Sequence, residues 1–130
     1  MQKTIVRLPG REGLWLPAQH VLTPFTLRDP TATGYDYAIT VPSDEYWELD
    51  VVYAARDGGA TLTLSALSVR DPANVQGIDV DTATAATAVS FGFNPPLKVS
   101  PGFSLGFAIP AYGAGDTYKC YLLGTIFKRL

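Results

Sequence analysis

Two aspartates that lie two residues apart are the first candidates for chemistry in this sequence. Asp79 and Asp81 flank Val80 in a stretch that we expect to be extended, which would put both carboxylates on one strand face about 7 Å apart. That spacing suits a calcium site or an acid and base pair, and Asp71 precedes them in the same loop. The residues that usually complete a metal loop do not follow, so we expect no metal and no cofactor.

The single histidine and the single cysteine are the other candidates for chemistry. His20 adjoins an expected strand and has no carboxylate close in sequence, so we interpret it as a surface or partly buried side chain and not as a general base. Cys120 follows Lys119, but strand alternation puts the lysine on the opposite face. We therefore expect a structural cysteine and no enzyme. A small hydrolase is the alternative if folding joins His20 to two carboxylates.

The aromatic side chains number fifteen, and seven of them are tyrosines. Five tyrosines flank expected turns, where their rings could form flat platforms for a carbohydrate: Tyr35, Tyr37, Tyr46, Tyr112 and Tyr118. The same rings could instead fill the interior and the contacts between subunits, because aromatic side chains bury well and anchor interfaces. We favour this second interpretation.

The charges are unevenly distributed along the chain. The net charge of -2 divides into +3 for residues 1–28, -8 for residues 29–118 and +3 for residues 119–130. An acidic body repels phosphates, so we expect no nucleic-acid partner. No apolar run is long enough to span a membrane, and residues 1–7 lack the apolar stretch of a signal peptide. We expect synthesis in a cytoplasm, followed by retention there or export inside a larger particle.

The N-terminal segment reads as an arm. Prolines and glycines hinder a packed strand in residues 1–17, which combine basic side chains with a short apolar plug. Such a segment gains more by lying in an apolar groove of a neighbour, where Trp15 could anchor it and the cations could meet carboxylates. We predict an arm over residues 1–17 and one β-domain over residues 18–130. The predicted partner-binding residues are Lys3, Arg7, Arg11, Leu14, Trp15 and Leu16.

The rest of the chain alternates apolar and polar residues at period two, which predicts strands. The residues expected on the buried face of the clearest strand are Trp47, Leu49, Val51 and Tyr53. Asp57-Gly58-Gly59 follows this strand and predicts a hairpin over residues 46–70. Further strands are expected at residues 4–8, 21–28, 35–41, 86–93, 103–109 and 117–128.

Three details refine this all-β prediction. Pro24 indicates that its strand either lies at a sheet edge or is split in two. The alanines of residues 81–88 alternate with threonines, so this window favours extended structure over a helix. Residues 120–127 are apolar on both faces, which is typical of a strand inside the fold or in a subunit interface. We predict an antiparallel β-sandwich or jelly roll that forms a homotrimer.

Two stretches resemble small virion proteins of tailed phages. In residues 41–49 a proline, a polar turn and Trp47 open a long strand, as in a segment common in those proteins. Ser100-Pro101-Gly102 and the later Gly115-Asp116-Thr117 bracket two strands, and they are similar to the last hairpin of phage jelly-roll domains. The resemblance covers about residues 41–130.

The resemblance implies a capsid decoration, or cement, protein. Such a protein is a trimeric jelly roll on the capsid surface of the virion, and it clamps neighbouring subunits of the major capsid protein, often with a terminal arm. The alternative is a fibre-head or adaptor module of the virion that binds carbohydrate or another virion protein. An exposed tyrosine platform favours the binding module, whereas buried aromatic residues favour the decoration protein.

Overall fold

The chain folds as an antiparallel β-sandwich, as the period-two pattern predicted. The computed structural model describes residues 5–7, 13, 15–17, 21–28, 30, 33–73 and 77–130, without the side chains of residues 16, 17 and 21–28. All regular structure in this part of the chain is β-strand. The strands are β1 (Trp15–Pro17), β2 (Val21–Arg28), β3 (Gly34–Thr40), β4 (Glu45–Gly58), β5 (Leu64–Arg70), β6 (Ile78–Ala86), β7 (Ala88–Val99), β8 (Ser104–Ile109) and β9 (Thr117–Arg129).

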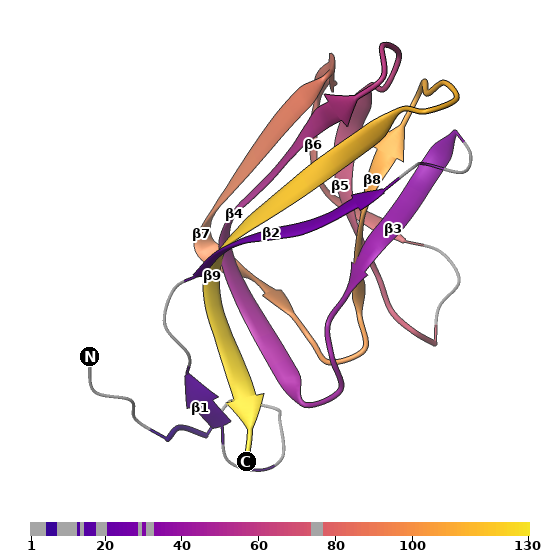
Figure 1. Ribbon diagram of the computed structural model, residues 1–130. Helices are drawn as coiled ribbons and strands as arrows, with labels where there is room; N and C mark the ends of the chain where they lie inside the picture. The colour runs from indigo at the N-terminus through magenta and orange to yellow at the C-terminus, as the bar shows by residue number, and fades with distance from the viewer. Residues whose placement is uncertain are drawn as a thin grey trace.

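The strands form two sheets that pack face to face (Figure 1). Sheet A has the order β1-β9-β4-β7, and β2 also pairs with β9. Sheet B has the order β3-β8-β5-β6. Among the described strands from β2 to β9, only β5 and β6 are consecutive strands of the same sheet. Each of the other connections crosses from one sheet to the other.

The predicted hairpin over residues 46–70 is wrong, because β4 belongs to sheet A and β5 to sheet B. The turn at Asp57-Gly58-Gly59 carries the chain between the sheets. Leu62 and Leu64 follow the turn and are buried in the core. The hydrophobic side chains after the turn therefore pack between the two sheets. The last two strands, β8 and β9, are likewise divided between the sheets and form no hairpin.

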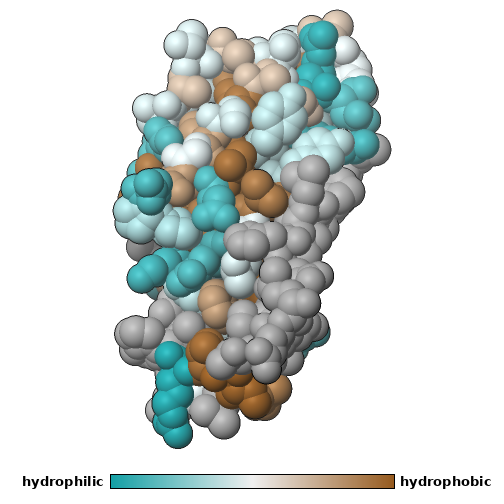
Figure 2. All heavy atoms as spheres, turned by 90° about the vertical axis from the view of Figure 1, so that its left-hand side faces the viewer, coloured by the Kyte–Doolittle hydropathy of each residue, from teal (hydrophilic) through white to brown (hydrophobic). Residues whose placement is uncertain are grey.

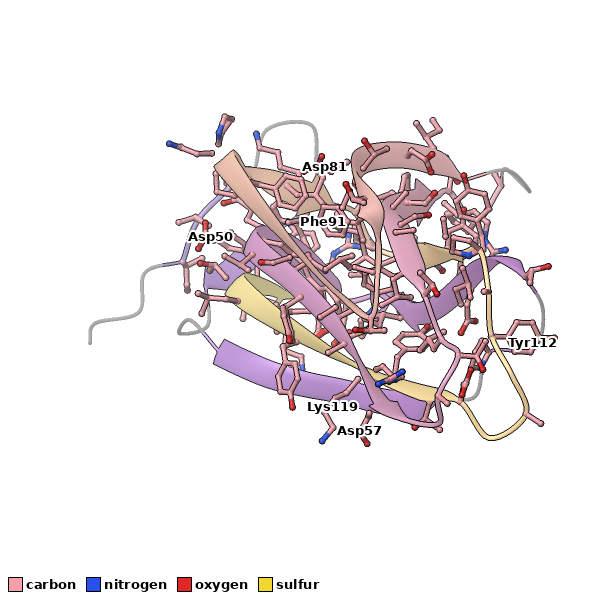
Figure 3. All side chains as sticks on the ribbon, turned by 90° about the horizontal axis from the view of Figure 1, so that it is seen from above. Asp50, Asp57, Asp81, Phe91, Tyr112 and Lys119 are labelled. Atoms are coloured by element: carbon pink, nitrogen blue, oxygen red, sulfur yellow. The ribbon has the colours of Figure 1, made fainter. Side chains whose placement is uncertain are left out.

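The core lies between the sheets, and aromatic side chains from both sheets pack within it. Phe107 on β8 packs edge-on against Tyr118 on β9, with ring centroids 5.9 Å apart. The Tyr118 hydroxyl donates to a carboxylate oxygen of Asp36 on β3 over 2.8 Å, so one hydrogen bond ties the two sheets together. Phe91 on β7 also belongs to this core, as Figure 3 illustrates.

The alternation along β4 reverses at Asp50. Leu49 lies opposite Gly124 of β9, and Val51 lies opposite the adjacent Leu123, so Asp50 is an extra residue that forms a β-bulge. Beyond the bulge the inward positions change, and Tyr53 is 37% exposed. The expectation that Val51 and Tyr53 share the buried face of Trp47 and Leu49 is therefore wrong.

Two smaller predictions are confirmed. The strand that contains Pro24, β2, pairs with β9 alone among the described strands, as expected of an edge strand. The alanine and threonine window is extended and forms most of β6. In the described part of the chain no helix is long and apolar enough to cross a membrane.

Candidate binding surfaces

The outer face of sheet A carries an uncovered apolar patch. Tyr53 lies opposite Tyr121, and Val51 lies opposite Leu123, on the neighbouring strands β4 and β9. The two tyrosine rings are 6.0 Å apart between centroids. We call these four residues the β4–β9 patch. Figure 2 views the molecule from this side, where hydrophobic side chains lie among polar ones in the upper half and gather again near the lower end.

The neighbouring strand β7 carries only small outward side chains beside this patch. Its residues opposite Ala55, Tyr53 and Val51 are Ala88, Ser90 and Gly92, so the outward side chains of β7 are small or absent here. The edge of the patch is polar, because Lys119 Nζ lies 3.9 Å from an Asp57 carboxylate oxygen (Figure 3). The outer face of sheet A thus places bulky side chains next to a row of small ones.

At the lower end of the same face, Trp15 of β1 covers Tyr46. Strand β1 pairs with the end of β9, and Trp15 packs edge-on against Tyr46 with ring centroids 6.4 Å apart. Tyr46 in turn contacts Phe127 across the sheet. Trp15 and Tyr46 are buried but do not belong to the core between the sheets, so they form a second apolar cluster outside it.

This contact corrects one part of the arm hypothesis. Trp15 is only 2% exposed, so its ring is already packed on its own domain and does not stand ready to anchor to a neighbour. The turn formers around it do not prevent pairing, because Trp15 and Val6 exchange two backbone hydrogen bonds of 2.7 and 2.8 Å. The prolines and glycines predicted that this segment would not form a paired strand. It does form one, because β9 extends to Arg129 and pairs with β1 there.

The other predicted arm residues have a mixed outcome. Arg7 is exposed. The backbone of Leu16 pairs with Lys128, and its side chain lies outside the described residues. Lys3, Arg11 and Leu14 also lie outside them, as does His20, which was considered as a general base and not as part of the arm.

The outer face of sheet B carries a row of stacked side chains. The guanidinium carbon of Arg70 lies 4.2 Å from the ring centroid of Tyr37, and the Tyr37 ring is nearly parallel to that of Tyr35 at 6.1 Å. The Tyr37 hydroxyl lies 2.9 Å from the Ser68 hydroxyl, and Tyr35 donates to Asp79 over 3.2 Å. We call these five residues the tyrosine row.

Two glycines make room for the tyrosine row. A Cβ atom on Gly106 of β8 would lie 2.6 Å from Tyr37 Cδ1, and one on Gly77 would lie 1.4 Å from the Tyr37 hydroxyl oxygen. Any other residue at either position would force the tyrosine ring to move. The two glycines and the Ser68 contact therefore fix Tyr37 in one orientation.

The five tyrosines that flank turns divide between the two interpretations. Tyr46 and Tyr118 are buried, as the packing interpretation expected, and Tyr112 is partly buried at one end of the molecule (Figure 3). Tyr35 is 50% exposed and Tyr37 is partly buried beside it. The sequence did not reveal which pair would stack, because this depends on the small residues of β8 beneath the rings.

Asp79 and Asp81 do not form the predicted pair on one strand face. Asp79 lies opposite Ser68, and Asp81 lies opposite the adjacent Leu67. Neighbouring strand residues point to opposite faces, so the bulge at Val80 separates the two carboxylates. Among the described residues no group of three or more histidine, cysteine, aspartate or glutamate side chains could hold a metal ion.

The Cys120 thiol is buried in the core. Burial and the nearby Asp36 carboxylate raise the pKa of Cys120 to about 12. The thiolate is the reactive form of cysteine, so this thiol stays protonated and unreactive at neutral pH. The structural role predicted for Cys120 agrees with this environment.

A buried carboxylate ties together two of the connections between the sheets. One oxygen of Asp116 accepts from the backbone N–H groups of Ala60 and Thr61 over 2.9 and 3.3 Å, and the other accepts from Gly113 over 2.5 Å. Burial raises the pKa of Asp116, but the three backbone hydrogen bonds outweigh it and lower the pKa overall. The Asp116 carboxylate therefore acts as a structural group that holds the two connections together.

A hollow of about 320 Å³ opens between the edge strands β6 and β7. It is mostly apolar, with Asp71 and Lys98 at its rim. Its apolar lining residues are Val69, Ile78, Val80, Leu97 and Phe103. No local sequence pattern indicates this hollow, because the strands that form it belong to different sheets.

No protein-family model, curated protein or solved structure matches the chain.

Proposed function

We propose that the chain is a jelly-roll capsid decoration protein that stabilises a phage head. The strand order carries this proposal. Strands β2 to β9 form the two four-stranded orders β2-β9-β4-β7 and β3-β8-β5-β6, and connections that cross between two antiparallel sheets are typical of the jelly roll. Viral capsid domains use this architecture, in agreement with the resemblance of residues 41–130 to phage virion proteins.

The outer face of sheet A is the proposed contact between copies. Monomeric proteins rarely leave a large contiguous apolar patch exposed, and Tyr53 and Leu123 are each 37% exposed. The small residues of β7 offer a flat surface on which the β4–β9 patch of a second copy can pack. A contact between two different parts of one face is heterologous and can close into a ring, which is the kind of contact that the proposed homotrimer needs.

The basic N-terminal segment is the proposed contact with the major capsid protein. Trp15 holds the segment on sheet A, while Arg7 is exposed and can meet a carboxylate on the shell. Lys3 and Arg11 would act in the same way. In this proposal Trp15 positions the basic residues and does not itself enter the neighbouring subunit.

The proposal is tested by the heat resistance of capsids with and without the chain. Particles assembled without it should release their nucleic acid at a lower temperature, and adding back the purified chain should restore the original temperature. The Arg7→Ala variant should restore it less well at low salt, and its difference from the original chain should shrink as the salt concentration rises, because exposed charge pairs are screened. An unchanged release temperature without the chain would contradict the stabilising role.

A further inference from the structure

We propose that the tyrosine row on sheet B binds a neutral carbohydrate, with a pyranose ring lying against Tyr35. This inference is independent of the decoration role, because the tyrosine row lies on the opposite side of the sandwich from the β4–β9 patch. A trimer closed through sheet A would leave this surface free.

Tyr35 lies at one end of the tyrosine row, where its ring is exposed to solvent. Along β8, Ser104 lies opposite Arg70, Gly106 lies opposite Tyr37, and Ala108 lies opposite Tyr35. Arg70 and Tyr35 therefore flank Tyr37 on two sides, and the half-exposed Tyr35 ring has no further aromatic neighbour among the described residues. An exposed aromatic ring provides the flat apolar surface on which the C–H face of a sugar can lie.

The position of Tyr35 is fixed before any ligand arrives. Its ring packs beside Tyr37, which is itself held by Ser68 and by the space above Gly106. Its hydroxyl donates to Asp79. A ring held in this way loses little conformational entropy on binding, and such preorganisation favours affinity.

The polar groups around the ring match a neutral polyhydroxylated ligand. Asp79 is exposed and accepts the hydrogen bond from Tyr35, which leaves acceptor positions open on its carboxylate. The Arg70 guanidinium lies against the face of Tyr37 on the side away from Tyr35. Sugar hydroxyl groups donate hydrogen bonds, so those of a pyranose on Tyr35 can use the open acceptor positions of Asp79.

The Asp79 carboxylate disfavours anionic carbohydrates. It accepts a hydrogen bond from the Tyr35 hydroxyl over 3.2 Å, so an anionic sugar on this ring would be repelled by it. Arg70 lies beyond Tyr37 and is too far away to offset that repulsion. The hydroxyl groups of a neutral hexose meet no such repulsion.

Affinity electrophoresis tests the proposal with the full chain. We expect gels that contain neutral polysaccharides (galactomannan, dextran and laminarin in separate gels) to retard the chain, and a gel that contains the anionic polygalacturonate to leave its mobility unchanged. Tyr35→Ala should weaken the retardation about tenfold, the effect of losing one stacked ring. Tyr35→Phe keeps the ring and should retain most of the binding.

A matched control lies on the same edge strand as Asp79. Ile78 is 68% exposed and lines the hollow between β6 and β7, so Ile78→Ala should leave the retardation unchanged. Thermal melting of each variant verifies its fold, because Tyr35 lies outside the core. Absence of retardation in all three neutral gels, or equal retardation of the original chain and Tyr35→Ala, would overturn the proposal.

Discussion

Trp15 packs edge-on against Tyr46 with ring centroids 6.4 Å apart, outside the core of the sandwich. This contact makes the N-terminal segment part of the folded domain at one point. Val6 exchanges two backbone hydrogen bonds with Trp15, so the adjacent Arg7 is exposed beside a fixed strand. In the proposed function, this fixed base carries the attachment arm.

Replacing Trp15 should separate the anchoring of the segment from the folding of the domain. Trp15→Ala removes a buried ring from the second apolar cluster, so the free energy of unfolding should fall by about 3 kcal/mol. The core between the sheets does not include Trp15, so the variant should remain folded. Urea denaturation followed by tyrosine and tryptophan fluorescence measures the loss.

Trp15→Phe is the matched control for this prediction. The indole Nε1 of Trp15 is buried and has no acceptor among the described residues, so phenylalanine retains an aromatic contact while it removes a donor that none of them satisfies. Its free energy of unfolding should change by less than about 1 kcal/mol. A loss as large as that of Trp15→Ala would show that the indole nitrogen, and not ring packing, holds the segment.

How far the sequence predicts this fold depends on the range of each interaction. Alternation identified most strands because it reflects local burial, and Pro24 identified an edge because proline lacks a donor. The pairing of β4 and β5 was misread because Asp57-Gly58-Gly59 turns the chain equally well into a hairpin or a crossover. The crossover is held by a residue far along the chain. The Asp116 carboxylate accepts hydrogen bonds from the backbone just after this turn.

The candidate surfaces were less predictable than the strands. Each depends on residues that only the register brings together. The β-bulge at Asp50 turns Tyr53 outward to meet Tyr121. The tyrosine row depends on Gly106, which has no signal of its own in the sequence yet permits Tyr37 to lie above it.

Gly59 should be intolerant of a side chain. Its φ angle is +82°, and a Cβ atom would lie 1.8 Å from an Asp116 carboxylate oxygen. Gly59→Ala should therefore lower the free energy of unfolding by about 2 kcal/mol or more, from backbone strain and the broken connection. Gly92 has no atom within 4 Å of its Cβ position, so Gly92→Ala should be neutral or slightly stabilising in the same denaturation experiment.

The Asp116 carboxylate should make stability depend on pH in the acid range. Its folded pKa lies below the ordinary value of 3.8, so its contribution is present above that value and is lost as the pH falls through the folded pKa. In Asp116→Asn an amide N–H group would face a backbone N–H group, so the melting temperature should fall at neutral pH. The acid-dependent part of the melting curve should also become flatter, and an unaltered pH profile would contradict this role.

The proposed trimer contact should be sensitive to charge at Leu123. Leu123→Asp places a carboxylate in the β4–β9 patch, where burial against another copy would be costly. Light scattering should find a trimer for the original chain and a monomer for this variant. Ile78→Asp, on the far edge of sheet B, should remain a trimer. A monomeric original chain at high concentration would refute the contact.

The copy number of the chain on purified virions tests the decoration role most directly. Quantitative mass spectrometry can measure the molar ratio of the chain to the major capsid protein. A decoration protein that occupies positions over the whole shell predicts a ratio of the same order as that of the capsid subunits. Absence from the virion, or only a few copies per particle as expected of a fibre or adaptor, would contradict the proposal.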